Sequence, residues 1–231
     1  MEKQYKKIKE HWSNTSPTIS GILNGYPESN KPDVEFSNKL LNYIQDNNLL
    51  NNFDIVLDCA CGIGRVTENV LINYFKKIDM FERENNFINY LNKKYKNNNN
   101  INVFKNSLQN FNQNKKIICN KYNCIWIQWC LENLSKNDIN KFLKKCEKIL
   151  DKNGIIIIKE NCIIDIKNKN NKNKNNKNKK FFAEEDFSEI RTLNFYLNII
   201  KKNKFKVIKY GINENWPKKL ISLYYFILKK Q

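Results

Sequence analysis

The sequence lacks several features that would assign it to common classes of protein. No apolar stretch comes near the roughly 20 residues that a membrane-spanning helix needs, so no such helix is expected. No apolar run follows the first residues, so we do not expect a secretory signal. Proline and glycine are scarce, with 4 and 6 residues among 231, and no linker rich in proline, glycine or serine divides the chain. One well-buried domain spanning residues 1–231 is therefore expected.

Histidine is nearly absent, which bears on metal binding. The only histidine, His11, is not near Cys59 and Cys61 in the sequence, so these cysteines have no histidine to complete a zinc set and no metal site is expected. The seven cysteines are an odd number, and several fall in or beside apolar strands. These features indicate reduced thiols and a location in the cytoplasm or nucleus.

Acidic residues are outnumbered, 23 against 41 lysines and arginines, which gives a formal charge of +18. Residues 167–180 hold seven lysines among asparagines, and removing these lysines leaves +11 for the rest of the chain. Such a tract has no apolar surface to bury, so we expect a disordered surface insertion. The alternative, which we favour less, is a basic arm that contacts RNA or an acidic partner.

Apolar runs and amphipathic segments alternate along the rest of the chain. Ser135 is expected to cap one of the helices, and the last two strands are expected to form a hairpin. This order predicts an α/β fold whose mostly parallel sheet has an antiparallel edge. Helices are expected over 34–50, 65–75, 85–95, 136–150 and 188–202, and strands over 53–58, 77–82, 102–105, 122–127, 155–158, 205–210 and 221–228.

The loop DCACGIGR, residues 58–65, directly follows the first predicted strand. Parallel α/β sheets bind nucleotides at such turns, and small residues let the backbone approach a ligand closely. Glu82, about 24 residues after Asp58, stands where a carboxylate could hold ribose hydroxyls. The loop alone would fit a dinucleotide or S-adenosylmethionine. Because the sequence has no phosphate-binding loop and its Gly-x-Gly-x-x-Gly pattern is incomplete, a ligand without phosphates fits better.

Several blocks of the sequence together indicate one known family. They are DCACGIGRVT and those that cover 12–26, 126–129, 154–161 and 186–191. With them the chain resembles, nearly end to end apart from the insertion, the protein α-N-terminal methyltransferases. These enzymes methylate the free N-terminal amine of proteins that begin X-Pro-Lys. The resemblance implies the seven-stranded Rossmann-like methyltransferase fold, with residues 1–50 as a helical extension that forms part of the substrate channel.

The resemblance also implies S-adenosylmethionine as the cofactor, with S-adenosylhomocysteine as its product. Arg65 would meet the methionine carboxylate as a charge-assisted pair, and Gln128 would lie beside the same end. Glu82 stands where the family has an aspartate for the ribose, and Leu108 and Gln109 stand where it frames the adenine. The implied cofactor residues are Gly62, Gly64, Arg65, Glu82, Leu108, Gln109 and Gln128.

For the substrate, the resemblance implies that Asn161 binds the terminal nitrogen and that Asp186 is a candidate proton acceptor. An α-ammonium has a pKa of about 8, and only its neutral form can attack the methyl group, so orientation supplies most of the rate. Ordinary core packing remains an alternative for the tryptophans, as does a helix N-cap for Asp186. The acidic residues at 184–186 fit recognition of a substrate lysine. The other implied substrate residues are Trp12, Trp129, Asn133, Ser188, Glu184 and Glu185.

Four departures from the family pattern concern peptide preference more than the reaction. Ala60 replaces the first loop glycine and should be tolerated if its φ is negative. Asn133 replaces a histidine and cannot take a proton at neutral pH, so base work would rest on Asp186. Ile221 replaces a late tyrosine, and Lys218 and Lys219 replace an acidic stretch.

Three functions remain open. The leading one is methylation of X-Pro-Lys N-termini by a monomeric enzyme, with ribosomal or chromatin-associated proteins as the substrates that the resemblance suggests. The second is a methyltransferase for a small amine or an RNA, which the N-terminal block argues against. The third is a non-catalytic basic RNA-binding module with the same fold, which Arg65, Asn161 and Asp186 argue against.

Overall fold

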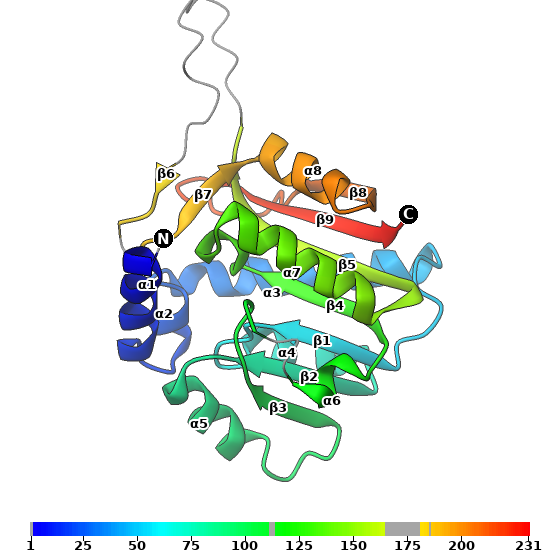
Figure 1. Ribbon diagram of the computed structural model, residues 1–231, viewed down its shortest axis with the longest axis horizontal. Coiled ribbons are helices and arrows are strands. Elements are labelled where there is room, and N and C mark those ends of the chain that lie inside the picture. Colours follow the sequence, from blue (N-terminus) through cyan, green and yellow to red (C-terminus); the bar gives the residue numbers. More distant parts are fainter. Residues whose placement is uncertain (1, 111–113, 165–180, 185) are drawn as a thin grey trace, which may run out of the picture.

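A twisted sheet crosses the computed structural model, which describes residues 2–110, 114–164, 181–184 and 186–231 (Figure 1). Its main path has the order β3-β2-β1-β4-β5-β9-β8, in which the first five strands are parallel and β9 is antiparallel to both β5 and β8. This order confirms the predicted α/β fold with its antiparallel edge. The strands are β1 (Ile55–Cys59), β2 (Lys77–Glu82), β3 (Ile101–Lys105), β4 (Tyr122–Gln128), β5 (Leu150–Ile163), β8 (Phe205–Ile212) and β9 (Leu223–Lys230). The whole of the tract 167–180 falls in the undescribed range 165–180, so the expectation about this insertion lies outside the described residues.

A small hairpin extends the carboxyl end of β5. It consists of β6 (Phe181–Phe182) and β7 (Glu189–Thr192), and β7 pairs in parallel with β5 at Cys162 and Ile163. The prediction of a helix from residue 188 was therefore wrong for its first turn, because pairing with β5 draws these residues into a strand. The helix α8 (Leu193–Lys202) begins only after Thr192, whose hydroxyl accepts a hydrogen bond from the backbone N–H of Phe195.

Helices cover both faces of the sheet and its carboxyl edge. Ser135 caps α7 as predicted, because its Oγ accepts a hydrogen bond of 3.0 Å from the backbone N–H of Asp138. The helix predicted over 65–75 is shorter, and a 3₁₀ turn (Leu71–Asn73) follows it. The other helices are α1 (Glu2–Asn14), α2 (Ile19–Ile22), α3 (Asn30–Asp46), α4 (Arg65–Asn69), α5 (Asn85–Lys94), α6 (Lys115–Ile118) and α7 (Lys136–Ile149).

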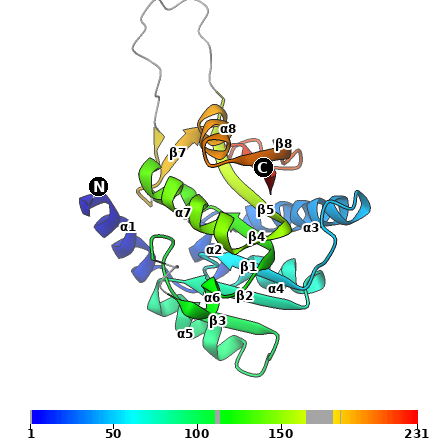
Figure 2. The same cartoon turned by 45° about the vertical axis from the view of Figure 1, so that its right-hand side comes forward.

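The core has two apolar layers, one on each face of the sheet. Ile156 and Ile158 of β5 pack into the layer that contains α7 and α8, whereas Ile155 and Ile157 pack into the layer that contains α3 and α4. Helices thus cover β5 on both faces. This explains its unbroken isoleucine run, because a strand that is buried on both faces does not alternate between apolar and polar residues. Figures 1 and 2 show α7 and α3 on opposite faces.

The N-terminal helices lie at the end of the sheet where the parallel strands terminate. Figure 1 shows α1 and α2, in dark blue, at the side toward which the arrow of β1 points. Ile8 of α1 is fully buried, and Trp12 lies beside Phe87 of α5 with 6.5 Å between ring centroids. The helical extension therefore packs against the edge at which an α/β sheet binds its ligands. In the described part of the chain, no helix combines the length and apolarity needed to cross a membrane.

Candidate active site

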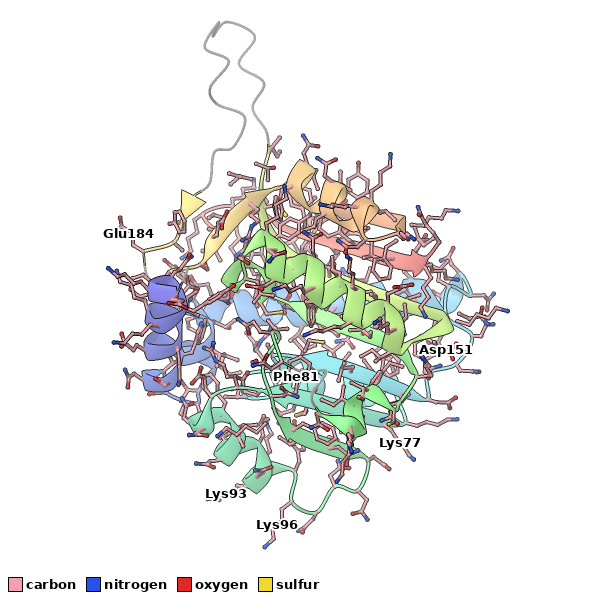
Figure 3. The ribbon with its side chains drawn as sticks, viewed as in Figure 1. Lys77, Phe81, Lys93, Lys96, Asp151 and Glu184 are labelled. Atoms are coloured by element: carbon pink, nitrogen blue, oxygen red, sulfur yellow. The ribbon has the colours of Figure 1, made fainter. Side chains whose placement is uncertain are left out.

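A cleft of about 140 Å³ opens at the carboxyl ends of β1, β2 and β4. The loop after β1, the end of β2 and the end of β4 form its floor, and Ile8 of α1 and Ile22 of α2 contribute to its wall. Phe81, labelled in Figure 3, also lines it. Most of the predicted site residues come together here: Trp12, Gly62, Arg65, Glu82, Leu108, Gln109, Gln128, Trp129 and Asn133.

The loop after β1 owes its shape to three residues with positive φ. Gly62 and Gly64 have φ of 58° and 74°, and Ala60 has φ of 53°. The condition stated for Ala60, a negative φ, is thus not met. A non-glycine residue in this region costs about 1–2 kcal/mol, so the loop holds Ala60 under backbone strain. Gly64 is the N-cap residue of α4 and does not line the cleft, and a Cβ added to it would lie 3.0 Å from the side chain of Leu91 of α5.

Two buried carboxylates hold this loop in place. Asp58 at the end of β1 accepts a hydrogen bond of 2.7 Å from the hydroxyl of Thr67, and burial raises its pKa to about 6. Glu82 accepts backbone N–H bonds through both oxygens, at 2.9 Å from Gly62 and at 3.0 Å from Glu84. Burial raises the pKa of Glu82, and these N–H groups oppose the rise. Oε1 also accepts from the backbone N–H of Arg83, whereas among the described residues Oε2 accepts only from Gly62, so Oε2 keeps a lone pair that can accept from a ligand hydroxyl in the cleft.

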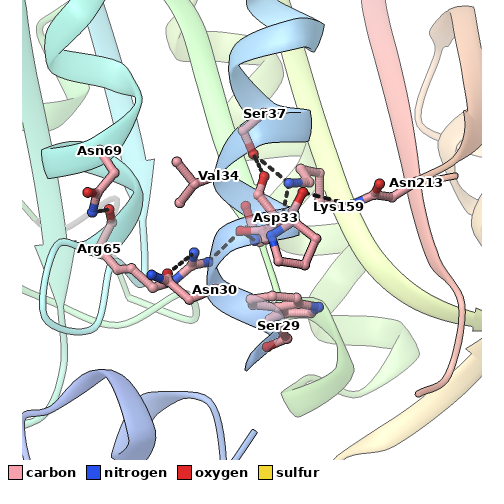
Figure 4. Close-up of polar contacts among 12 residues, drawn as sticks. Ser29, Asn30, Asp33, Val34, Ser37, Arg65, Asn69, Lys159 and Asn213 are labelled. Carbon is pink, nitrogen blue, oxygen red and sulfur yellow. Dashed lines mark hydrogen bonds and ion pairs between the residues drawn. The ribbon is translucent and has the colours of Figure 1, made fainter. Parts of the chain in front are cut away.

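Arg65 is almost fully buried, with 3% of its surface exposed, because it pairs with Asp33 of α3. Its Nη2 lies 2.7 Å from Asp33 Oδ2, its Nη1 donates to Asn30 Oδ1 at 3.1 Å, and its guanidinium lies 5.2 Å from the ring centroid of Trp129. Figure 4 shows this contact beside α3. Arg65 is therefore not a solvated residue of the first helical turn, although it is the first residue of α4.

Asp33 organises the polar contacts at this end of the cleft. It also accepts a 2.8 Å hydrogen bond from Gln128 Nε2 and forms an ion pair with Lys159, which follows the isoleucine run of β5. Burial raises the pKa of Asp33, but the charges of Lys159 and Arg65 outweigh it and hold that pKa below its ordinary value. Sequence reasoning missed Asp33, although it shares a helix face with Ser37, Leu40 and Ile44 at helical spacing, which was an available signal.

The far end of the cleft is apolar. Leu108 is buried there beside Phe81, and Gln109 follows it in the loop after β3. Lys145 of α7 donates a hydrogen bond to the backbone carbonyl of Gln109, which ties this loop to α7.

Trp12, Trp129 and Asn133 also line the cleft, and we call this part of its lining the tryptophan wall. Both tryptophans are only partly buried and line the cleft, so ordinary core packing does not account for them. Trp129 has φ of 50°, and its Nε1 lies 3.4 Å from Asn161 Oδ1. The Oδ1 atom of Asn133 is buried and has no hydrogen-bond partner among the residues that the structure describes.

Asp186 lies just behind this wall rather than in the lining itself. It is 4% exposed, and it accepts hydrogen bonds of 2.9 Å from Asn24 Nδ2 and from the backbone N–H of Ser188. No helix follows it, so the helix N-cap interpretation was wrong. His11 Nε2 lies 3.1 Å from Asn24 Oδ1, which ties the single histidine to this carboxylate through one amide.

The remaining predicted substrate residues have different surroundings. Ser188 is buried, with 2% exposed, whereas Glu184 is exposed and points outward at the periphery in Figure 3. Glu184 and Asp186 thus do not share one acidic face, and Glu185 lies outside the described residues. Within the described ranges, no three histidine, cysteine, aspartate or glutamate side chains are arranged to hold a metal ion.

A second buried acidic pair, Glu132 and Glu160, was not anticipated. Glu160 Oε1 accepts backbone N–H bonds of 3.0 and 2.8 Å from Cys130 and Leu131, and burial raises the pKa of Glu160 to about 7. Burial, and then the charge of Glu160, raise the pKa of Glu132 well above its ordinary value. Arg191 of β7 donates to the backbone carbonyl of Leu131 at 2.9 Å and so holds this segment behind the cleft.

Comparison with known proteins places this architecture. The sequence model of a family described as AdoMet dependent proline di-methyltransferase matches residues 1–229. Alpha N-terminal protein methyltransferase 1 of Dictyostelium discoideum is 31% identical over 237 residues, covering 100% of this chain and 81% of the relative. N-terminal Xaa-Pro-Lys N-methyltransferase 1 of Homo sapiens is 29% identical over 234 residues, covering 99% and 96%.

Solved structures share the fold. A SAM-dependent methyltransferase from Leishmania major superposes with a TM-score of 0.82 at 28% identity, covering 98% of this chain and 83% of that one. A S-adenosylmethionine-dependent methyltransferase from Clostridium acetobutylicum gives a TM-score of 0.62 at 17% identity, covering 84% and 90%, which supports the fold alone. Because the family match spans almost the whole sequence, this chain belongs to the AdoMet-dependent proline di-methyltransferase family, whose cofactor is S-adenosylmethionine.

Proposed function

We propose that this protein transfers a methyl group from S-adenosylmethionine to the free α-amino group of protein N-termini of the X-Pro-Lys type. The observation that carries the proposal is the position of Asp186, a buried carboxylate behind the tryptophan wall. Its hydrogen-bond donors, Asn24 and Ser188, are both neutral, and none of the described cations forms an ion pair with it. A buried carboxylate without a cation suits a cationic ligand such as an N-terminal ammonium.

The chemistry of the cleft fits S-adenosylmethionine. A cation, Arg65, lies at one end for a carboxylate, Glu82 in the middle can accept from ribose hydroxyls, and the apolar surface of Leu108 at the other end suits adenine. A Cβ added to Gly62 would meet only Ile22, at 3.8 Å, so the loop leaves room for close approach. When bound, the cofactor supplies an electrophilic methyl group on a sulfonium.

The residues at and behind the tryptophan wall would prepare the amine. The indole of Trp129 holds Asn161, so the amide can accept a hydrogen bond from the terminal nitrogen and orient its lone pair. Asp186 would take the proton of the ammonium, and Asn24 and Ser188 fix its two oxygens. Pairing of β7 with β5 brings these segments to the same end of the sheet. We also propose that residues 1–50 form part of the substrate channel, supported by Trp12 in the lining.

Mass spectrometry with X-Pro-Lys peptides tests the proposal. Free peptides should gain methyl groups, and otherwise identical N-acetylated peptides should not. Asn161→Ala should lower turnover, because orientation acts in the transition state. Asp186→Asn should also lower turnover and be partly rescued at higher pH, where more of the amine is neutral. Asp54→Asn, which changes an exposed aspartate, is the matched control.

Methylation of the acetylated peptide at the same rate would contradict the proposal, because the acceptor would then be a side chain. Methyl transfer to RNA or to a small amine alone would support the second function considered for this sequence. Cofactor binding without transfer to any of these acceptors would favour a module that does not catalyse.

A further inference from the structure

Three ionised side chains that come from distant parts of the chain meet beneath the methionine end of the cleft. Asp33 of α3 lies between Arg65 of α4 and Lys159 of β5, and Figure 4 shows the two cations on opposite sides of it. Asp33 and Lys159 are fully buried, and Arg65 is 3% exposed. Lys159 Nζ also donates to Ser37 Oγ at 2.6 Å, so its ammonium is fixed on the side away from Arg65.

The charge balance of this group is unusual for a buried ion pair. Arg65 and Asp33 alone would be neutral, and the carboxylate would then cancel the charge that Arg65 offers to the cleft. Lys159 adds a second cation to the same carboxylate. Asp58, another carboxylate within electrostatic reach of Arg65, bonds to Thr67 instead.

A buried lysine is a costly choice if its only role is to stabilise the fold. Burial lowers the pKa of Lys159, and the charge of Asp33 opposes this change. Replacing a buried ion pair by apolar residues of similar shape is often neutral or stabilising, so such a pair is weak evidence for stability. Lys159 also lies near the rings of Phe36 and Trp126, at 5.6 and 5.7 Å from their centroids, surroundings that an apolar side chain would fill well.

We propose that Lys159 is a positioning residue for cofactor recognition: by neutralising Asp33, it leaves the charge of Arg65 available to the carboxylate of the methionine end. Asp33 in turn holds the guanidinium in one orientation. The pair Asp33–Lys159 therefore sets the preference of the cleft for nucleosides that carry a carboxylate. The inference rests on the proposed use of S-adenosylmethionine.

Two ligands separate this role from a structural one. S-adenosylhomocysteine has the amino-acid end, and 5′-methylthioadenosine keeps the nucleoside but lacks that end. In calorimetry, Lys159→Met should weaken the binding of S-adenosylhomocysteine about tenfold or more, because one charge near the carboxylate is lost. It should change the affinity for 5′-methylthioadenosine by less than about twofold, since that ligand has no carboxylate. Lys76→Met, at an exposed lysine, is the matched control.

The double variant Asp33→Asn with Lys159→Met provides the decisive comparison. It removes one buried charge of each sign, so Arg65 keeps an uncancelled charge and affinity for S-adenosylhomocysteine should return to within about threefold of wild type. If Lys159→Met weakens both ligands equally, or if the double variant is no better than the single one, the inference is overturned. If wild-type protein binds neither ligand, the assignment of the cofactor itself fails, which is a separate outcome. Lys159→Met leaves Asp33 paired with Arg65, and circular dichroism of both variants checks that they fold.

Discussion

Replacing Glu160 by glutamine should make the protein more stable at alkaline pH, although the residue lies in the centre of the fold. Glu160 is fully buried on β5, and burial raises its pKa from 4.5 to about 7. Its Oε2 is buried and has no hydrogen-bond partner among the described residues. Glutamine keeps the shape and one acceptor oxygen for the N–H groups of Cys130 and Leu131, but it carries no charge.

The direction and size of the effect follow from proton linkage. Between about pH 4.5 and pH 7 the folded state keeps a proton that the unfolded chain has released, so the free energy of unfolding falls as pH rises. The difference between these pKa values corresponds to about 3 kcal/mol, at about 1.4 kcal/mol for each pKa unit. Glu132 is coupled to Glu160, so the transition belongs to the pair and is spread over a wider pH range.

Urea unfolding followed by circular dichroism measures the effect. The variant should match wild type at about pH 5 and exceed it by about 2–3 kcal/mol at about pH 8. Taking the difference between the two proteins cancels the titration of other groups. Glu35→Gln, at an exposed position on α3, is the matched control and should show no such trend. A difference that does not vary with pH would refute the reasoning, because the backbone donors would then keep Glu160 ionised throughout.

Two further predictions concern the loop after β1 and the lysine-rich tract. Ala60→Gly should raise the free energy of unfolding by about 0.5–1 kcal/mol, because relief of the strain at φ of 53° exceeds the added entropy of the unfolded chain. Loss of stability in chemical denaturation would show that the methyl group of Ala60 packs usefully. Deleting residues 167–180 should leave the melting temperature and the affinity for S-adenosylhomocysteine unchanged, because the tract has no apolar residue to pack. A large drop in melting temperature would contradict that expectation, and loss of a salt-sensitive affinity for RNA would favour the basic arm.

The sequence by itself determined the order of strands and helices, because hydrophobic periodicity is a local property. The strand predicted over 77–82 has the same bounds in the structure, and the Ser135 cap was predicted from its position before an amphipathic run. The loop at 58–65 and Glu82 were singled out because they follow the ends of predicted parallel strands, which converge at one edge of any such sheet. The resemblance to the family supplied the other cofactor candidates, and most of them line the same cleft.

Only the tertiary structure decided which charges meet. Asp33 and Lys159 are 126 positions apart, and their pairing depends on how α3 packs against β5, which no local pattern encodes. The same holds for β7, whose short strand pairs with the end of β5 on one side and with β6 on the other. The raised pKa of Glu160 arises from burial by elements that lie elsewhere in the sequence. Periodicity indicates which face of an element is buried. Packing across the whole chain determines which side chains that face meets, and this sets the electrostatics of the site.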